Sequence, residues 1–343
     1  MPKQVAEEFG GEEKRRIERW LDEIEKVIAG KRGVIELIAI ACLAEGHVLL
    51  EDVPGVGKTT LVQALASSLG CGFKRIQFTP DLLPSDITGC TILEPQTMEP
   101  VFRPGPLMAN IVLADEVNRA SPKTQSALLE AMEEGKVTAD GVTYALPRPF
   151  FLLATQNPLR HEGTYPLPEA QMDRFMFRLG LGYPAPEQEV GMLERVRLGH
   201  PLERVEPVFT AETLLKMQQR VRGVHVDAAI KHYIVRLADA TRRHPEVELG
   251  ASPRASIALM RAAQARAWMD GRTFVIPDDV KTLAARVFGH RIVLKPEAGL
   301  LRDDVTALLE ELIRSVPVPF LSPHGTRGEQ AEAAVRPRRG WFT

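Results

Sequence analysis

The stretch Val53-Pro-Gly-Val-Gly-Lys-Thr-Thr60 stands between a short apolar run and a helical pattern, and this placement constrains the fold more than any other feature. Residues 47–51 predict a buried strand, and residues 60–69 predict a helix. Glycines at such a junction let backbone N–H groups and the helix N-terminus surround phosphate groups. The sequence therefore predicts a phosphate-binding loop made of Pro54, Gly55, Val56, Gly57, Lys58, Thr59 and Thr60.

Two residues of this loop have specific expected roles. Lys58 is placed to reach the β- and γ-phosphates of a nucleotide, and Thr59 to bind Mg²⁺ through its hydroxyl. The strict motif has glycine where this chain has Asp52. The residues that would contact phosphate are nevertheless retained, so we expect a working loop.

A second apolar run, residues 110–115, ends in the acidic pair Asp115-Glu116. A carboxylate at a strand end beside a phosphate loop can hold a metal ion through its water shell, and its neighbour can polarise the attacking water. We assign the metal role to Asp115 and the water-activating role to Glu116. A helix cap or a surface pair is the alternative interpretation.

A third apolar run ends at Asn157, just before Pro158. Its side chain is expected to orient the lytic water or contact the γ-phosphate. The alternative is an asparagine that turns the chain before proline.

Five short apolar runs separated by helices or long loops predict a parallel five-stranded sheet in a three-layer αβα domain. The predicted strands cover residues 47–51, 74–79, 110–115, 150–155 and 175–181. Two insertions are predicted as hairpins, residues 87–107 and residues 136–146, the second with a type I′ turn at Asp140-Gly141. Between them Ser121, Pro122 and Gly135 predict the start and end of a helix.

The pattern becomes helical without strands after Pro184-Ala-Pro186. We therefore predict a nucleotide-binding domain over residues 1–183, a C-terminal helical lid domain over residues 184–315, and a poorly ordered tail over residues 316–343.

The net charge of −2 gives no general attraction to nucleic acid, which is therefore not the expected partner. Charged residues interrupt the longest apolar stretch, residues 33–50, so no membrane span is expected. The N-terminal residues lack the apolar core of a secretory signal. These features favour a cytoplasmic protein.

Several separate stretches together make the sequence resemble the MoxR family of AAA+ ATPases, from about residue 27 to residue 313. They are Gly46-His-Val-Leu-Leu-Glu-Asp-Val-Pro-Gly-Val-Gly-Lys-Thr59, Phe78-Thr-Pro-Asp-Leu-Leu-Pro-Ser-Asp-Ile-Thr-Gly89, Asp115-Glu-Val-Asn-Arg-Ala-Ser-Pro-Lys-Thr-Gln-Ser126, Ala154-Thr-Gln-Asn-Pro158, Leu167-Pro-Glu-Ala-Gln-Met-Asp-Arg-Phe175 and Gly250-Ala-Ser-Pro-Arg254.

The resemblance implies roles that spacing does not give. Asn157 matches the sensor-1 position, Arg174 the arginine finger offered to a neighbouring subunit, and Arg254 the sensor-2 position. Val27 and Ile28 lie where the family packs against adenine. Without the family, Arg174 would be interpreted as a partner of Asp173 or as a side chain whose stem covers apolar surface, and Arg254 as a solvated residue at a helix start.

The family also implies partners and cofactors. These are ATP, Mg²⁺, self-association into a hexameric ring, a client protein for a chaperone-like activity, and a partner with a von Willebrand factor A domain. Two other functions stay open from the sequence. One is a motor acting on nucleic acid or in magnesium chelation, which would need a basic pore. The other is an ATP-dependent assembly switch with little turnover.

Overall fold

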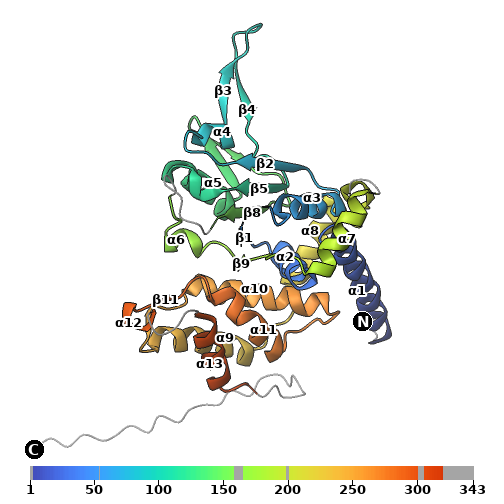
Figure 1. Ribbon diagram of the computed structural model, residues 1–343, viewed down its shortest axis with the longest axis vertical. Helices are drawn as coiled ribbons and strands as arrows, with labels where there is room; N and C mark the ends of the chain where they lie inside the picture. Colours follow the sequence, from blue (N-terminus) through green and yellow to red (C-terminus); the bar gives the residue numbers. More distant parts are fainter. Residues whose placement is uncertain (1–2, 54, 158–164, 198–200, 300–304, 320–343) are drawn as a thin grey trace, which may run out of the picture.

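A computed structural model gives the structure of residues 3–53, 55–157, 165–197, 201–299 and 305–319 (Figure 1). Pro54 of the predicted phosphate loop lies outside these described residues, as does the expected tail from residue 320 onward.

A parallel five-stranded sheet lies at the centre of the N-terminal half, with the strand order β2-β5-β8-β1-β9. In this order the strands are β2 (Phe73–Gln77), β5 (Ile111–Asp115), β8 (Phe151–Gln156), β1 (Val48–Glu51) and β9 (Phe177–Leu179). All five predicted strands are confirmed, with small shifts at their ends. Because the strands are parallel, the phosphate loop, the acidic pair and Asn157 follow adjacent strands at one edge of the sheet.

Helices cover both faces of this sheet. Successive side chains of a strand point to opposite faces, and accordingly Val48 and Leu50 pack into one apolar cluster and Leu49 into another. The first cluster includes α1 (Lys3–Glu25), α2 (Arg32–Leu43) and α3 (Lys58–Ser68), and the second includes α4 (Pro84–Thr88) and α5 (Pro122–Glu134). The predicted three-layer αβα architecture is confirmed.

Helix α5 begins and ends where its sequence signals indicate. The Ser121 hydroxyl accepts a hydrogen bond from the Thr124 backbone N–H at 3.4 Å, and Pro122 occupies the first turn. Gly135 ends the helix with a φ of 62°, in the left-handed region that glycine enters without strain. A 3₁₀ turn, η1 (Val117–Arg119), connects the acidic pair to this helix.

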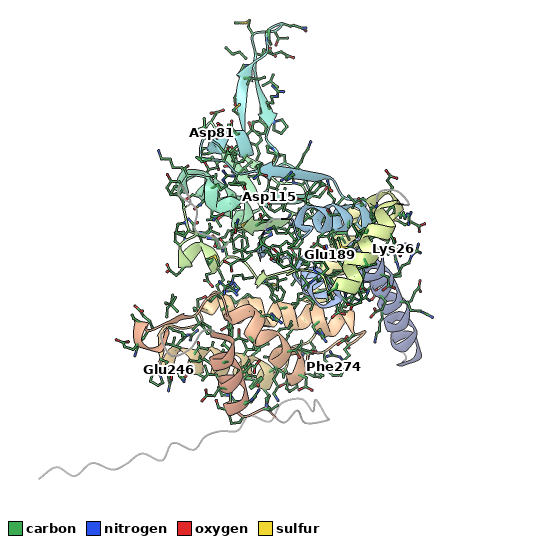
Figure 2. All side chains as sticks on the ribbon, in the orientation of Figure 1. Lys26, Asp81, Asp115, Glu189, Glu246 and Phe274 are labelled. Carbon is green, nitrogen blue, oxygen red and sulfur yellow. The ribbon has the colours of Figure 1, made fainter. Side chains whose placement is uncertain are left out.

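Both predicted hairpins are present. One is β3 (Gly89–Leu93) with β4 (Pro100–Pro104), and the other is β6 (Lys136–Ala139) with β7 (Val142–Ala145). Asp140 and Gly141 have φ values of 50° and 79°, as a type I′ turn requires. The β3–β4 hairpin projects from the rest of the molecule, with side chains on both of its sides (Figures 1 and 2).

The two hairpins contact each other. The Phe102 and Tyr144 rings stack with their centroids 3.8 Å apart and their planes 9° apart. The Thr91 backbone N–H donates to Asp140 Oδ2 at 2.7 Å. The two hairpins therefore pack against each other.

The C-terminal half is mainly helical. Its helices are α7 (Pro186–Arg197), η2 (Pro201–Arg204), α8 (Ala211–Arg222), α9 (Ala228–Arg243), α10 (Pro253–Met269), α11 (Pro277–Phe288), α12 (Pro296–Gly299) and α13 (Val305–Ser315), whereas the short α6 (Glu169–Met172) precedes β9 in the N-terminal half. The expectation that strands stop after residue 184 is wrong, because β10 (Val247–Leu249) and β11 (Val293–Leu294) form a small antiparallel pair. Such short strands carry no periodic signal. Among the described helices, none combines the length and apolar character that a membrane crossing needs.

One apolar core joins the two halves. It contains residues of α1, α2 and α3 together with residues of α8 to α11. A polar contact supports the same junction, because Gln218 Nε2 of α8 donates to the Cys42 carbonyl of α2 at 2.8 Å. A domain boundary between residues 183 and 184 stays a prediction, since the buried surface runs across it.

Candidate nucleotide site

A cavity of about 380 Å³ lies at the carboxyl ends of β1, β5 and β8. Its size falls within the range of ordinary small-molecule sites. The lining residues are Gly55, Gly57, Lys58, Thr59, Thr60, Arg75, Gln77, Asp115, Glu116, Thr155 and Asn157. Most of the residues predicted to bind a nucleotide and its metal ion therefore lie together. Figure 2 labels Asp115, which ends β5 in the central sheet.

The loop between β1 and α3 has the backbone that a phosphate cradle needs. Gly55 and Gly57 have φ values of 87° and 90°, which residues with a side chain rarely adopt. Gly57 is also the N-cap of α3, so the free N–H groups of that helix face the cavity. Val56 does not line the cavity but packs against the main apolar core.

The Lys58 ammonium is partly buried and held by its own loop. It donates to the Asp52 carbonyl at 2.8 Å and to the Val53 carbonyl at 3.1 Å. Partial burial lowers the pKa of Lys58 from its ordinary value, while the charges of Asp52, Asp115 and Glu116 act in the opposite direction. An anion at the cavity would take over from two neutral carbonyls, which is a favourable exchange for a cation.

Asp52 explains the departure from the strict motif. One of its carboxylate oxygens, Oδ2, accepts from the backbone N–H groups of Leu181 and Gly182, each at 2.6 Å, and the other accepts from Val53 N at 2.9 Å. A glycine here would lose all three bonds. The aspartate ties the start of the phosphate loop to the segment that follows β9.

Asp115 is nearly buried and already neutralised within the chain. Arg75, on the neighbouring strand β2, donates to Asp115 Oδ2 from Nε at 3.1 Å and from a terminal nitrogen at 2.6 Å. The Thr155 hydroxyl donates to Asp115 Oδ1 at 2.5 Å. Any metal ion bound at this carboxylate would therefore compete with the Arg75 guanidinium.

Glu116 is held just beyond the end of β5 in the left-handed backbone region, with a φ of 58°. Its backbone N–H donates to the Thr155 hydroxyl at 2.9 Å. Its carboxylate oxygen Oε2 accepts from Gln77 Nε2 at 2.8 Å and from Arg119 at 2.9 Å. The carboxylate thus has a defined position beside the cavity, and it makes no capping hydrogen bond to the turn that follows.

The residues expected near adenine do not line the cavity. Both residues, Val27 and Ile28, are buried. A side chain at Gly57 would meet the Ile28 terminal methyl at 3.3 Å, so Ile28 contacts the loop directly.

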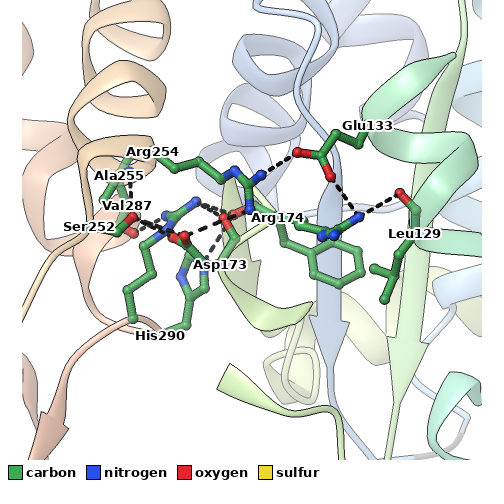
Figure 3. Close-up of polar contacts among 11 residues, drawn as sticks. Leu129, Glu133, Asp173, Arg174, Ser252, Arg254, Ala255, Val287 and His290 are labelled. Atoms are coloured by element: carbon green, nitrogen blue, oxygen red, sulfur yellow. Dashed lines mark hydrogen bonds and ion pairs between the residues drawn. The ribbon is translucent and has the colours of Figure 1, made fainter. Parts of the chain in front are cut away.

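Arg174 and Arg254 lie away from this cavity. Both line a second cavity of about 210 Å³, with Glu133, Asp173 and Arg291 among its other residues, and no described residue lines both cavities. Arg174 pairs with Glu133 at 2.7 Å rather than with Asp173. Arg254, in the first turn of α10, pairs with the same Glu133 carboxylate (Figure 3).

The residues at the first cavity fit a nucleoside triphosphate with a divalent cation. A glycine-rich loop, a helix N-terminus and a lysine can cradle phosphate oxygens. The Thr59 hydroxyl and the Asp115 carboxylate supply the oxygen ligands that Mg²⁺ prefers. The site residues that the sequence did not predict are Arg75, Gln77 and Thr155. Alternation along residues 73–77 would have put Arg75 and Gln77 on one face, but nothing local places that face against Asp115.

Comparisons with known proteins point to an ATPase family. The model of the "ATPase family associated with various cellular activities (AAA)" matches residues 47–177, and an "AAA lid domain" matches residues 239–312. The protein YeaC of Bacillus subtilis, described as uncharacterized, is 56% identical over 87% of this chain and 93% of its own. Chaperone MoxR1 of Mycobacterium tuberculosis is 41% identical over 93% of this chain and 87% of its own.

A crystal structure of a Cytophaga hutchinsonii protein assigned as an ATPase is 38% identical to this chain. It superposes with a TM-score of 0.85 and covers 92% of this chain and 99% of the other. The fold, the phosphate loop with its acidic pair, and the named relatives lead to one family. The chain belongs to the MoxR family of AAA+ ATPases.

Proposed function

We propose that this protein hydrolyses Mg-ATP in a hexameric ring and uses the energy to remodel or activate a client protein. The observation that carries the proposal is the division of its ionic groups between two cavities. Lys58, Asp115 and Glu116 line one cavity, whereas Arg174 and Arg254 line the other. A complete site would form where the first cavity of one copy meets the second cavity of the next.

The nucleotide would be held by the chain's own backbone and by Lys58. Backbone N–H groups at Gly55 and Gly57 and at the start of α3 would bind the β-phosphate, with Lys58 bridging to the γ-phosphate. Thr59 and Asp115 would hold Mg²⁺. The metal ion would neutralise charge on the β- and γ-phosphate oxygens.

Glu116 would accept the proton of the attacking water. Its contacts with Gln77 and Arg119 fix the carboxylate at the edge of the cavity. Asn157 follows β8, between the strands that carry the phosphate loop and the acidic pair, which suits it to orient that water or bind the γ-phosphate. General-base catalysis of this kind contributes roughly 10² to 10⁴ in rate.

Arg174 would supply its guanidinium to the nucleotide of a neighbouring subunit. An arginine acting in this way is worth roughly 10³ to 10⁵ in rate, or about 4 to 7 kcal/mol. Arg254 lies beside Arg174, so we propose that it contacts the same neighbouring phosphate. Self-association would then be required for full activity.

The two hairpins are the proposed contact with the client. Ile92, Leu93, Met98 and Val101 of the β3–β4 hairpin are all at least 40% exposed, and clustered exposed apolar side chains commonly mark protein contacts. Leu83 of the preceding loop is also exposed, whereas Leu82 packs against the core. The relative named Chaperone MoxR1 supports a chaperone-like role. A partner with a von Willebrand factor A domain and a cytoplasmic location, where ATP is available, belong to the same proposal.

A role on nucleic acid has less support. The β6–β7 hairpin carries Lys136 as its sole cation, and Glu94 and Glu99 lie near the tip of the other hairpin. Nucleic-acid motors instead need cationic surfaces along the strand they bind. Stimulation of ATP turnover by DNA would revive that function.

Phosphate release per subunit, measured across a wide range of protein concentration, tests the proposal. Specific activity should rise and then saturate as subunits complete each other's sites. Lys58→Ala should abolish nucleotide binding, and Arg174→Ala should bind ATP and assemble but lose at least about 10³ in rate. Wild-type turnover in Arg174→Ala would show that the second cavity plays no part in hydrolysis.

A further inference from the structure

Glu133 connects the two arginines of the second cavity. Its carboxylate lies between two guanidinium groups and gives one oxygen to each: Oε2 pairs with Arg174 at 2.7 Å, and Oε1 pairs with Arg254 (Figure 3). The three side chains come from α5, from the loop before β9 and from α10. One carboxylate therefore pairs with two cations from distant parts of the chain. Arg254 also lies 3.9 Å from an Asp173 carboxylate oxygen, and Arg174 also donates to the Leu129 carbonyl at 3.1 Å.

A buried network fixes the positions from which both arginines extend. Arg291 is 6% exposed and donates to Asp173 Oδ1 at 2.7 Å and to the Asp173 carbonyl at 2.9 Å. The Ser252 hydroxyl, at the N-cap of α10, donates to the same Asp173 carboxylate at 2.9–3.0 Å. Asp173 adjoins Arg174, and Ser252 is two residues from Arg254. The bases of the two arginines are thus held independently of Glu133.

The contacts with Glu133 are accessible and incomplete. The side chains of Glu133, Arg174 and Arg254 are 40%, 30% and 43% exposed. Arg174 Nε is buried yet has no hydrogen-bond partner among the described residues. A stronger or larger anion could therefore replace the carboxylate at the exposed parts of the two guanidinium groups.

Carboxylate and phosphate are recognised by the same guanidinium geometry, and phosphate carries more charge and more acceptor oxygens. We propose that the Glu133 carboxylate occupies, in the isolated subunit, the place taken in the ring by the terminal phosphate of a nucleotide bound to a second copy. This inference rests on the proposed function, in which Arg174 and Arg254 act on a neighbour. Assembly then exchanges one anion for another at prearranged arginines.

In this exchange the Glu133 carboxylate competes with the neighbouring phosphate for Arg174 and Arg254, so it opposes assembly. Two partly exposed ion pairs must break before the neighbouring phosphate can bind, and pairs of this kind contribute little each. Removing the carboxylate should therefore tighten association about threefold to tenfold. The rate of the assembled enzyme should stay within about twofold of wild type, because Glu133 is displaced from the complete site.

Glu133→Gln tests this, with Glu134→Gln as the matched control. Glu134 is exposed and lies in the same turn of α5, and within the described part of the chain the carboxylate that pairs with both arginines is that of Glu133 (Figure 3). Each substitution removes one negative charge, so the two variants differ in the contact with the arginines and not in net charge. Mg-ATP-dependent association is measured by sedimentation velocity in a Glu116→Gln background, where hydrolysis is suppressed. ATP turnover is measured against protein concentration without that background.

The expected result is a lower half-association concentration for Glu133→Gln alone, with an unchanged saturating rate. Equal association in the two glutamine variants would overturn the inference, and so would a tenfold or greater fall in the saturating rate of Glu133→Gln. Either result could occur while Arg174→Ala still abolishes turnover, which would leave the proposed function standing. If the wild-type protein did not associate and Arg174→Ala were fully active, both would fail.

Discussion

Replacing Asp52 with glycine, which gives the strict phosphate-loop motif, should lower the stability of this protein. In Asp52→Gly the glycine of the common pattern replaces an aspartate that is 9% exposed and accepts three backbone hydrogen bonds. The Leu181 N–H is buried and would lose its acceptor, while the N–H of Gly182 could find water. The motif alone would predict that Asp52→Gly leaves stability and ATP binding unchanged or improves them, whereas the hydrogen bonds of Asp52 predict a loss of stability.

The magnitude follows from the bonds that are lost. A hydrogen bond to a charged group contributes about 1.5–3 kcal/mol when its partner is left buried. The loss has three contributions: the buried bond from the Leu181 N–H, the partly buried bond from the Val53 N–H, and the added backbone freedom of glycine, about 0.5–1 kcal/mol. Together they lower the free energy of unfolding by roughly 3–4 kcal/mol. Asp52→Asn keeps one acceptor oxygen and should lose about half as much.

Urea unfolding followed by tryptophan fluorescence measures the loss. Trp20 and Trp268 both lie in the core that joins the two halves, so they report on unfolding of the whole. If Asp52→Gly were as stable as wild type and bound ATP equally or more tightly, the role given to the carboxylate would be refuted. If Asp52→Asn were less stable than Asp52→Gly, the bond count would be contradicted.

Three further outcomes follow from the described contacts. Burial lowers the pKa of His47 to about 4, below its ordinary 6.5, so between these pH values the unfolded chain binds a proton that the folded chain does not. The free energy of unfolding should therefore fall by about 3 kcal/mol as the pH drops from 6.5 to 4. His47→Gln should flatten that fall in unfolding measured at several pH values, and an unchanged slope would contradict this role of His47. Arg75→Gln should lower the Mg²⁺ concentration needed for ATP binding about twofold to fivefold, because Asp115 loses its competitor; a fluorescent-nucleotide titration checks this, and an equal shift in the exposed control Lys74→Gln would count against it. Glu116→Gln should bind ATP normally and lose at least about a hundredfold in phosphate release, so that normal turnover would require a different base.

The parts of the site that adjoin a strand end could be predicted from the sequence. The phosphate loop, Asp115, Glu116 and Asn157 each follow an apolar run directly, and parallel strands bring such positions to one edge. The type I′ turn at Asp140-Gly141 was predictable for a similar reason, because its two residues determine the backbone locally.

The contacts between elements could not be predicted in this way. Arg75 meets Asp115 because β2 is the strand next to β5, and no local pattern fixes strand order. Glu133 meets Arg174 and Arg254 through the packing of α5, a loop and α10. The β10–β11 pair was missed because strands of three and two residues show no alternation.

The core shared by α1–α3 and α8–α11 has a consequence for motion. Turning the helical half against the sheet would expose Trp20, Ile38 and Leu259, each now at most 1% exposed, and exposing one such side chain costs about 1.5–3 kcal/mol. Contacts between separate chains, which are smaller and more polar on average, yield at lower cost. In the proposed ring we therefore expect a nucleotide-driven cycle to tilt whole subunits against each other, with each subunit moving as a rigid block and the motion concentrated at the contacts between copies.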